Sequence, residues 1–342
     1  MTQTDTQTET LSDGGSPSRS GSARHRLVGV LLDYGVLGFL VALMIALTVL
    51  SPTFFTSRNL SNLTGQWAPV GIMAIAATMV IIAGGFDLSM GATFVFTSVV
   101  AAWVGTEHST VVAYAAALGL GMGIGLVNGI IIRFGGINPF VATLGTSFIV
   151  TGVGFAATDA QPFYIYDGSF SWLGSERSFG IPHAGILLIV LLVVSGLVLA
   201  GTVYGRSLYA IGGNEEAARL AGLRVQSITV STYVLSGAAA AVAGIVAASQ
   251  LGAAQMTTDI AVLFDVITVV IIGGTSLAGG SGAIWRTAVG LGILAALGNG
   301  FNQLNLGSYT QDIITGLIVL GALGVDRLLQ QYRSGAIGKV TA

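Results

Sequence analysis

The chain has 342 residues, of which 53% are hydrophobic and only 8% are charged, and its formal net charge at pH 7 is −2. Because soluble domains carry about 25% charged residues, this composition excludes an ordinary soluble protein and indicates an integral membrane protein whose backbone polar groups are paired within helices. The chain has no cysteine, which excludes disulfides and thiolate metal sites, and nothing in its net charge indicates a nucleic-acid partner.

The N-terminal residues 1–23 are rich in Ser, Thr, Gly, Gln and Asp, and they cannot bury enough apolar surface to fold. No apolar segment begins near Met1, so a cleaved signal peptide is not expected. We therefore predict a disordered cytoplasmic tail over 1–26, a transmembrane domain over 27–331 and a cytoplasmic tail over 332–342.

The transmembrane domain contains ten apolar runs. A straight membrane span needs about 20 residues, and three of the runs are shorter, so these could be tilted, broken or re-entrant. The short runs are 90–104, 260–272 and 283–297. The sequence thus predicts an all-α polytopic bundle of about 10 transmembrane segments, with eight spans plus half-helices as the alternative. The remaining runs are 34–50, 67–83, 110–132, 139–157, 184–203, 226–248 and 313–329.

Positive charge predicts the orientation of the bundle. With the N-terminus inside and ten crossings, eleven Lys and Arg residues fall on inner segments and only Arg58 and Arg177 on outer segments. Cytoplasmic loops carry such an excess, so we expect both termini in the cytoplasm and the loop at about 158–183 outside. The inner residues are Arg19, Arg24, Arg26, Arg133, Arg206, Arg219, Arg224, Arg286, Arg327, Arg333 and Lys339.

The stretch 81–91 reads IIAGGFDLSMG and places an aspartate among small residues between two apolar runs. Gly84 and Gly85 permit a tight turn and close backbone approach. Asp87, followed closely by Ser89, is costly inside a membrane unless it reaches water, a donor or a helix N-terminus. We expect Asp87 to cap the helix that follows, and a role in the translocation path is the alternative.

A polar stretch, 205–225, predicts a short helix between two later apolar runs. Asn214 is a good helix N-cap, and the acidic pair that follows it matches the positive end of the helix dipole. Gly222 can end the helix in the left-handed conformation. A helix of about two turns cannot cross a bilayer, but another protein can grip it.

The stretch 265–277, DVITVVIIGGTSL, carries an acid inside an apolar run and then a glycine pair. An intramembrane acid such as Asp265 is a functional candidate, although a buried hydrogen-bonded role is an equal alternative. The segment 79–85 echoes 269–274, which hints at an internal repeat. The candidates for the translocation path or for structural roles are Gly84, Gly85, Asp87, Ser89, Asp265, Gly273, Gly274, Thr275, Ser276 and Asn299.

Four blocks of the sequence together resemble the ribose-permease branch of the permease subunits of ATP-binding-cassette (ABC) importers. They are GRSLYAIGGNEEAARLAG at 205–222, GGFDLSMG at 84–91, PFVATLGT at 139–146 and VVIIGGTSLAGGSG at 269–282. Phe86 and Met90 depart from the usual Ile and Val of the second block, which leaves its chemistry intact. The resemblance covers roughly 30–330 and is far more specific than any single block.

The resemblance implies a permease in the bacterial cytoplasmic membrane that imports a monosaccharide, such as ribose or another pentose. It implies as partners a separate ABC ATPase subunit, a periplasmic sugar-binding protein, a second permease copy in a homo- or heterodimer, and the lipid bilayer. No cofactor is expected in this chain, because ATP and Mg belong to the ATPase. It also implies that the short helix is the coupling helix that docks on the ATPase, through Asn214, Glu215, Glu216, Ala217, Ala218, Arg219 and Gly222.

The sequence motifs also predict that this chain is not an enzyme. A phosphate-binding loop needs Gly-Lys-Ser/Thr, and the only lysine is Lys339. One alternative is an ion-coupled secondary transporter that uses Asp87 and Asp265 as coupling acids. Another is an ABC permease for a nucleoside or a branched-chain amino acid. An enzyme acting on lipid-linked substrates would need clustered acids, histidines or metal ligands, and the sequence shows none of these clusters.

Overall fold

The computed structural model describes residues 19–258, 261–307, 309–311, 313–318, 320–321 and 324. Its contacts divide the chain into two units, Met1–Gly35 and Val36–Ala342, and the fold described below is that of the second unit. Most of the predicted N-terminal tail and the whole of the predicted C-terminal tail lie outside the described residues.

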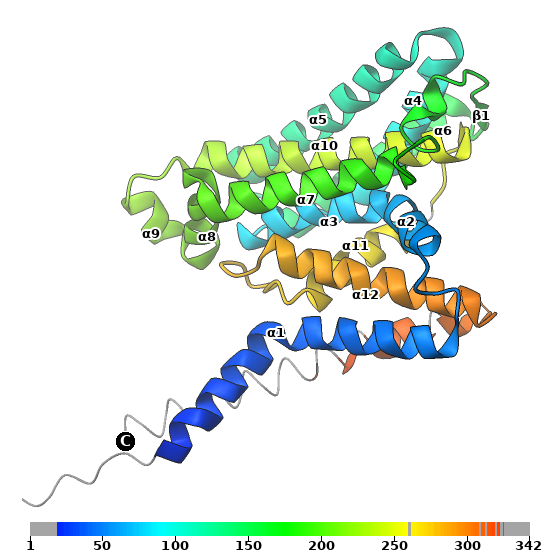
Figure 1. Cartoon of the computed structure of the whole chain (residues 1–342). Coiled ribbons are helices and arrows are strands. Elements are labelled where there is room, and N and C mark those ends of the chain that lie inside the picture. The colour runs from blue at the N-terminus through cyan, green and yellow to red at the C-terminus, as the bar shows by residue number, and fades with distance from the viewer. Residues whose placement is uncertain are drawn as a thin grey trace, which may run out of the picture. The chain divides into compact units, whose positions relative to one another are not determined.

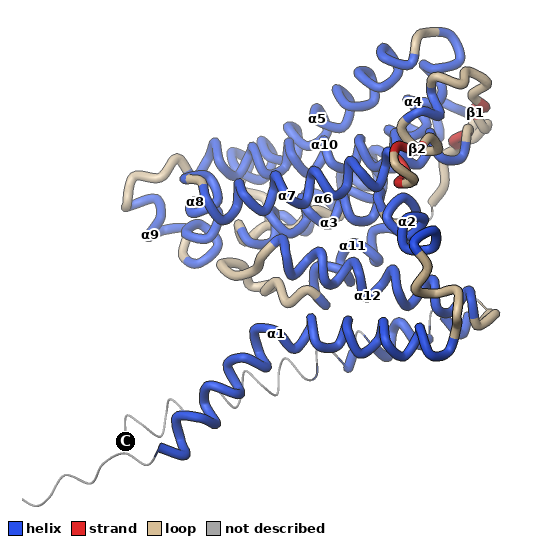
Figure 2. Tube along the Cα trace, in the orientation of Figure 1, coloured by secondary structure: helices blue, strands red, loops and turns tan. Residues whose placement is uncertain are grey.

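The described chain is built almost entirely from helices, with four two-residue strands (Figures 1 and 2). The helices are α1 (Arg19–Leu50), α2 (Ser57–Gln66), α3 (Ala68–Ile82), α4 (Ser89–Glu107), α5 (Thr110–Gly135), α6 (Pro139–Thr158), η1 (Phe170–Trp172), α7 (His183–Gly201), α8 (Val203–Gly213), α9 (Glu215–Leu220), α10 (Val225–Leu251), α11 (Ala261–Ile272) and α12 (Ile284–Gln303). The strands are β1 (Phe163–Tyr164), β2 (Arg177–Ser178), β3 (Ile181–Pro182) and β4 (Ala253–Ala254).

The all-α membrane class predicted from the sequence is confirmed, but the number of spans differs. Among the described residues, 6 helices are long and apolar enough to cross a membrane, or up to 7 if the bent pair α2 and α3 forms one span. Two of the short runs belong to longer helices. The run 90–104 lies within α4, and the run 283–297 lies within α12 except for its first residue, the N-cap Ala283. These helices extend to 19 and 20 residues. The run 260–272 does remain short, as the 12-residue helix α11.

Local sequence signals explain where several helices begin and end. Helix α6 begins at Pro139, the first residue of the apolar run 139–157, and the side chain of Asn138 caps it by accepting from the N–H of Phe140 at 2.9 Å. Helix α5 ends at Gly136, whose φ of 63° lies in the left-handed region. Helices α2 and α3 meet at a bend of 56°, where Trp67 separates them and a proline occupies the first turn of α3.

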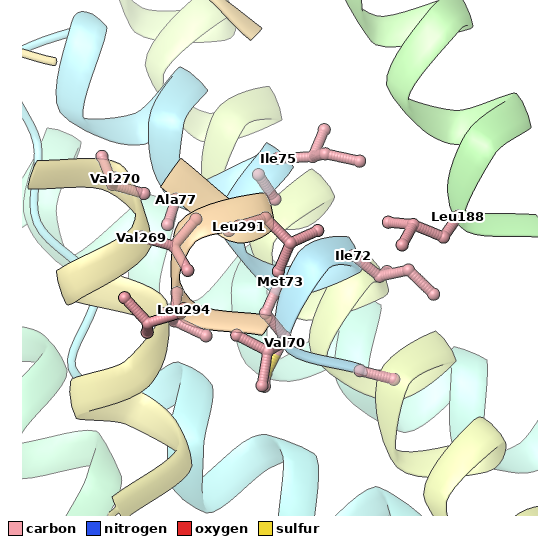
Figure 3. Packing of buried hydrophobic residues seen from close by; sticks show 14 of the residues in the cluster. Val70, Ile72, Met73, Ile75, Ala77, Leu188, Val269, Val270, Leu291 and Leu294 are labelled. Atoms are coloured by element: carbon pink, nitrogen blue, oxygen red, sulfur yellow. The ribbon is translucent and has the colours of Figure 1, made fainter. Parts of the chain in front are cut away.

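Helix α3 lies at the centre of the largest core cluster, and all 15 of its residues are buried. It packs against helices on several sides, and Figure 3 shows Val70, Ile72 and Met73 of α3 beside Leu188 of α7 and Leu291 of α12. A helix that is apolar on every face can be buried among other helices or exposed to lipid. The sequence pattern therefore could not tell a central helix from a peripheral one.

Helices α5 and α10 cross at backbone distance. A Cβ atom added at Gly125 would lie 2.1 Å from the carbonyl oxygen of Tyr233, and one added at Gly237 would lie 2.0 Å from that of Gly121. Small residues allow membrane helices to approach this closely. Part of the high glycine content therefore serves a single helix crossing.

The two ends of the long helices differ in structure. At one end, β1 pairs antiparallel with β4 after α10, and β2 pairs with β3 before α7. Helices α8 and α9 lie at the other end, as Figures 1 and 2 show. The loop predicted to face outward and the short polar helix predicted to face inward are thus on opposite ends of the bundle.

Candidate functional site

The short helix predicted in the polar stretch is present as α9, and its two caps have the expected chemistry. The side chain of Asn214 accepts from the N–H of Ala217 at 2.9 Å. At the other end Gly222 has a φ of +84°, and the N–H of Leu223 reaches back to the carbonyl of Ala218 at 3.1 Å. These bonds form a Schellman motif, so a helix of only six residues is fixed at both ends.

The two faces of α9 have different surroundings. Ala218 is buried in a small apolar cluster with Ile211 of α8 and Val225 of α10, which anchors the helix to its neighbours. On the opposite face, Glu216 and Arg219 form an ion pair at 2.7 Å whose side chains are both about 60% exposed, and Leu220 is 79% exposed. An exposed leucine next to an exposed ion pair is suited to contact a partner protein.

Glu215, for which the family resemblance implied the same docking role, forms an ion pair within the chain. Its carboxylate accepts from the guanidinium of Arg133, near the end of α5, and the arginine side chain is only 19% exposed. Glu215 thus ties α9 to α5, while the side chain of Glu216 is exposed on the surface of the helix. The family resemblance implied docking roles for both acids, and no local signal indicates the partner of Glu215, which lies 82 positions away.

The candidate acid Asp87 lies in a hydrogen-bonded cluster between α3 and α4. One carboxylate oxygen accepts from the N–H and hydroxyl of Ser89 at 3.0 and 2.6 Å, and the other accepts from the hydroxyl of Ser236 on α10 at 2.5 Å. Ser89 in turn accepts from the amide of Asn128 on α5 at 2.7 Å. The carboxylate therefore joins Ser89, the first residue of α4, to α10 directly and to α5 through Asn128. The N-cap position of α4 is Leu88 and has no side-chain capping bond, so Asp87 contacts the helix start from one position before the cap.

Side chains on three further helices complete this cluster, and the sequence analysis did not single them out as site residues. Asn128 is fully buried and its carbonyl oxygen has no partner among the described residues. Thr143 of α6 accepts from the N–H of Leu88 at 3.0 Å, and the hydroxyl of Tyr233 donates to the carbonyl of Phe86 at 3.3 Å. A polar residue at a small-residue helix crossing was the one signal that could have identified Asn128.

Residues 59–323 match the family described as the branched-chain amino acid transport system / permease component. The chain belongs to this permease family. Its relatives include the ribose import permease protein of Escherichia coli strain K12, which is 39% identical over 305 residues, or 88% of this chain and 95% of the relative. No solved structure matches the chain.

Two other relatives extend the comparison. The ribose import permease protein of Bacillus subtilis strain 168 is 36% identical over 87% of this chain and 94% of the relative. The L-arabinose transport system permease protein of Escherichia coli strain K12 is 37% identical over 88% of this chain and 92% of the relative. The similarity spans nearly the whole length in each case, so the matches include every element from α2 to α12.

The remaining candidates of the permease are not brought into one site. Asp265 is half-buried on α11, and Thr275 is buried in the loop after it. Asn299, on α12, forms a reciprocal amide pair with Asn59 of α2, with bonds of 2.9 and 3.0 Å. Helix α2 lies at the end of the bundle opposite α9 (Figure 1). Among the described residues no group of three or more His, Asp and Glu side chains could hold a metal ion.

Proposed function

We propose that this permease moves a pentose or a similar monosaccharide inward across the bacterial cytoplasmic membrane, driven by ATP hydrolysis on a separate subunit. The observation that carries the proposal is α9, a rigidly capped helix that projects an exposed ion pair and Leu220 beyond the membrane helices. Three relatives with 36–39% identity supply the substrate class, since two are named for ribose and one for L-arabinose. Both of these sugars are pentoses.

A second copy of the permease, identical or similar, is part of this proposal. Two hollows lined by described residues of one chain do not suit a sugar. A cavity of about 10 Å³ beside Asp87 holds at most one water, and a groove of about 430 Å³ between α7 and α12 is lined almost entirely by apolar side chains. A sugar needs several convergent hydrogen-bonding groups, which two facing chains can provide together.

The orientation follows the positive-inside rule. Arg206, Arg219 and Arg224 all lie on or beside α8 and α9, and this excess of positive charge supports a cytoplasmic position for this end. The opposite end, with the strand pairs, would then face the periplasm and receive a sugar-binding protein. There, Asp167 accepts from the hydroxyl and N–H of Ser169, and these hydrogen bonds hold the pKa of its carboxyl below its usual range.

Gentle extraction of the tagged chain from its native membrane tests the proposal directly. We expect an ABC ATPase and a periplasmic binding protein to co-purify, and the ligand of the binding protein identifies the sugar. In vesicles, uptake should require ATP and persist when an uncoupler collapses ion gradients. A chain that purifies alone and transports without ATP would instead be a secondary transporter.

Reversing the exposed charge on α9 should separate the permease from its ATPase. In Glu216→Lys, we expect co-purified ATPase to fall by about tenfold or more, because a like-charge contact replaces an attractive one at the docking surface. The protein should still insert and fold, since the Glu216 side chain is exposed and pairs with Arg219 on the same helix.

Two variants control this experiment. Glu216→Gln removes the charge without placing a cation at the start of the helix, and it should weaken docking less. Glu176→Lys makes the same charge reversal on an exposed residue at the opposite end, and it should leave the co-purified ATPase unchanged. Equal ATPase recovery for Glu216→Lys and the native protein would exclude α9 as the docking helix.

A further inference from the structure

Five glycines from three distant parts of the chain meet beside α9. They are Gly84 after α3, Gly212 and Gly213 at the end of α8, and Gly279 and Gly280 in the loop between α11 and α12. We call these five residues the glycine junction. A Cβ atom added at Gly212 would lie 1.8 Å from the carbonyl oxygen of Ile82 and 2.6 Å from the N–H nitrogen of Gly280.

The contacts within the junction are between backbones. The N–H of Gly280 donates to the carbonyl of Ile82 at 2.9 Å, which joins the α11–α12 loop to the end of α3. A Cβ atom added at Gly279 would lie 3.0 Å from both the carbonyl oxygen of Gly212 and the Cα of Gly84. No side chain lies between these backbones to absorb a displacement, and packed contacts of this kind compress little.

The two loops that meet α8 have the same backbone geometry. After α3, the N–H of Gly85 reaches the carbonyl of Val80 at 2.9 Å, and Gly84 has a φ of +79°. After α11, the N–H of Thr275 reaches the carbonyl of Val270 at 3.2 Å, and Gly274 has a φ of +75°. Two short apolar helices thus end in equivalent caps, and the chain that follows each cap contacts the same end of α8.

Tyr209 fixes α8 to this arrangement with a side-chain bond. It lies one turn before Gly212, and its hydroxyl donates to the carbonyl of Gly282 at 2.7 Å. Helix α8 is in turn separated from α9 by the single residue Asn214. Helices α9 and α8 together therefore carry the exposed docking face and the contacts with the end of α3 and the α11–α12 loop.

We propose that the glycine junction transmits displacements of α9 to the ends of α3 and α11, with Tyr209 as a positioning residue. This inference rests on the proposed function, since it needs an ATPase that moves α9. A partner that moves α9 moves α8 with it. The backbone contacts of α8 then shift the loop between α3 and α4 and the loop between α11 and α12. Loss of the Tyr209 bond should loosen this linkage without altering the docking surface.

Coupling between ATP hydrolysis and uptake is the measurement that tests the linkage. The permease is reconstituted in vesicles with its ATPase and binding protein, and ATP hydrolysed per sugar imported is measured for each variant. We expect Tyr209→Phe to raise this ratio by about two- to tenfold, the range that corresponds to one hydrogen bond. The thermal midpoint of each variant in detergent reports whether it is folded.

Tyr204→Phe is the matched control. Tyr204 is on the same helix, and its hydroxyl is bonded to that of Ser231 on α10 at 2.9 Å, outside the junction. Its ratio should equal that of the native protein. Equal ratios for the two tyrosine variants would overturn the linkage, whereas a native complex that does not couple ATP to uptake would overturn the proposed function itself.

A second pair of variants tests the linkage without any tyrosine. Gly280→Ala and Gly136→Ala carry the same backbone strain, because both glycines have left-handed φ values, +72° and +63°. The new methyl group meets Gly213 in the first and open space in the second. A raised ratio in Gly280→Ala alone supports transmission through the junction, and equal ratios in both variants contradict it.

Discussion

The Gly125→Val variant is expected to lose the folded bundle. At this position α5 approaches α10 so closely that a Cβ atom would lie 2.1 Å from the carbonyl oxygen of Tyr233 and 2.9 Å from its carbonyl carbon. Overpacking a core usually costs about 1–3 kcal/mol, and here the obstacle is backbone that no rotamer change can move. We expect a cost above that range, measured as a large fall in thermal midpoint and in monodisperse protein after extraction.

Gly123→Val is the control for this experiment. Gly123 lies two residues away on the same helix, and a Cβ atom added there meets nothing within 4 Å. The same substitution should therefore leave the thermal midpoint nearly unchanged. Equal losses in both variants would mean that helix propensity, rather than the crossing with α10, decides the stability of α5.

The Asp87→Ala variant should be the second most damaging change. Removing the carboxylate leaves three donors without their acceptor, namely the N–H and hydroxyl of Ser89 and the hydroxyl of Ser236. Each buried polar group without a partner costs about 1–3 kcal/mol, so we expect a loss of roughly 3 kcal/mol or more after the hydroxyls rotate. Chemical or thermal unfolding in detergent measures this loss.

Two milder variants distinguish a structural Asp87 from one in the translocation path. Ser236→Ala removes one bond of the cluster and should cost about 1 kcal/mol. Asp87→Asn keeps an acceptor but removes the charge, so it should be less destabilised than Asp87→Ala. Normal stability of Asp87→Asn with abolished uptake would assign the charge to the path, against the structural role that the contacts favour.

Local signals were readable from the sequence, and α9 is the clearest case. Its N-cap Asn214 and its terminal Gly222 act within a few positions of the helix, so their chemistry can be predicted without knowing the fold. The same holds for the helix start at Pro139. The family resemblance needed only that four short blocks occur in order, and the matched family and relatives confirmed it.

Long-range partners were not readable. The sequence indicated that Asp87 needs donors, but Ser236 lies 149 positions further on and nothing in the sequence links the two. Arg133 and Glu215 form a similar case, because nothing in the sequence links these two residues, which form an ion pair in the structure. The docking and path roles of the other candidate residues remain predictions, since the structure gives their positions and contacts but no partner.

The burial of α3 also constrains how the protein is made. Translation must add a further 221 residues after Ile82 before α12 is complete at Gln303 (303 − 82), and at 5–20 residues per second this takes roughly 10 to 45 s. During that interval α3 must reside in lipid or beside the insertion machinery. Its one hydroxyl, on Thr78, already bonds to the carbonyl of Ala74 at 2.7 Å within the helix, so it presents no unpaired group to lipid. The bond between Thr78 and Thr287 then forms only when α12 arrives. Helix α3, which is central in the folded bundle, thus has a composition that is also stable in lipid before the later helices are made.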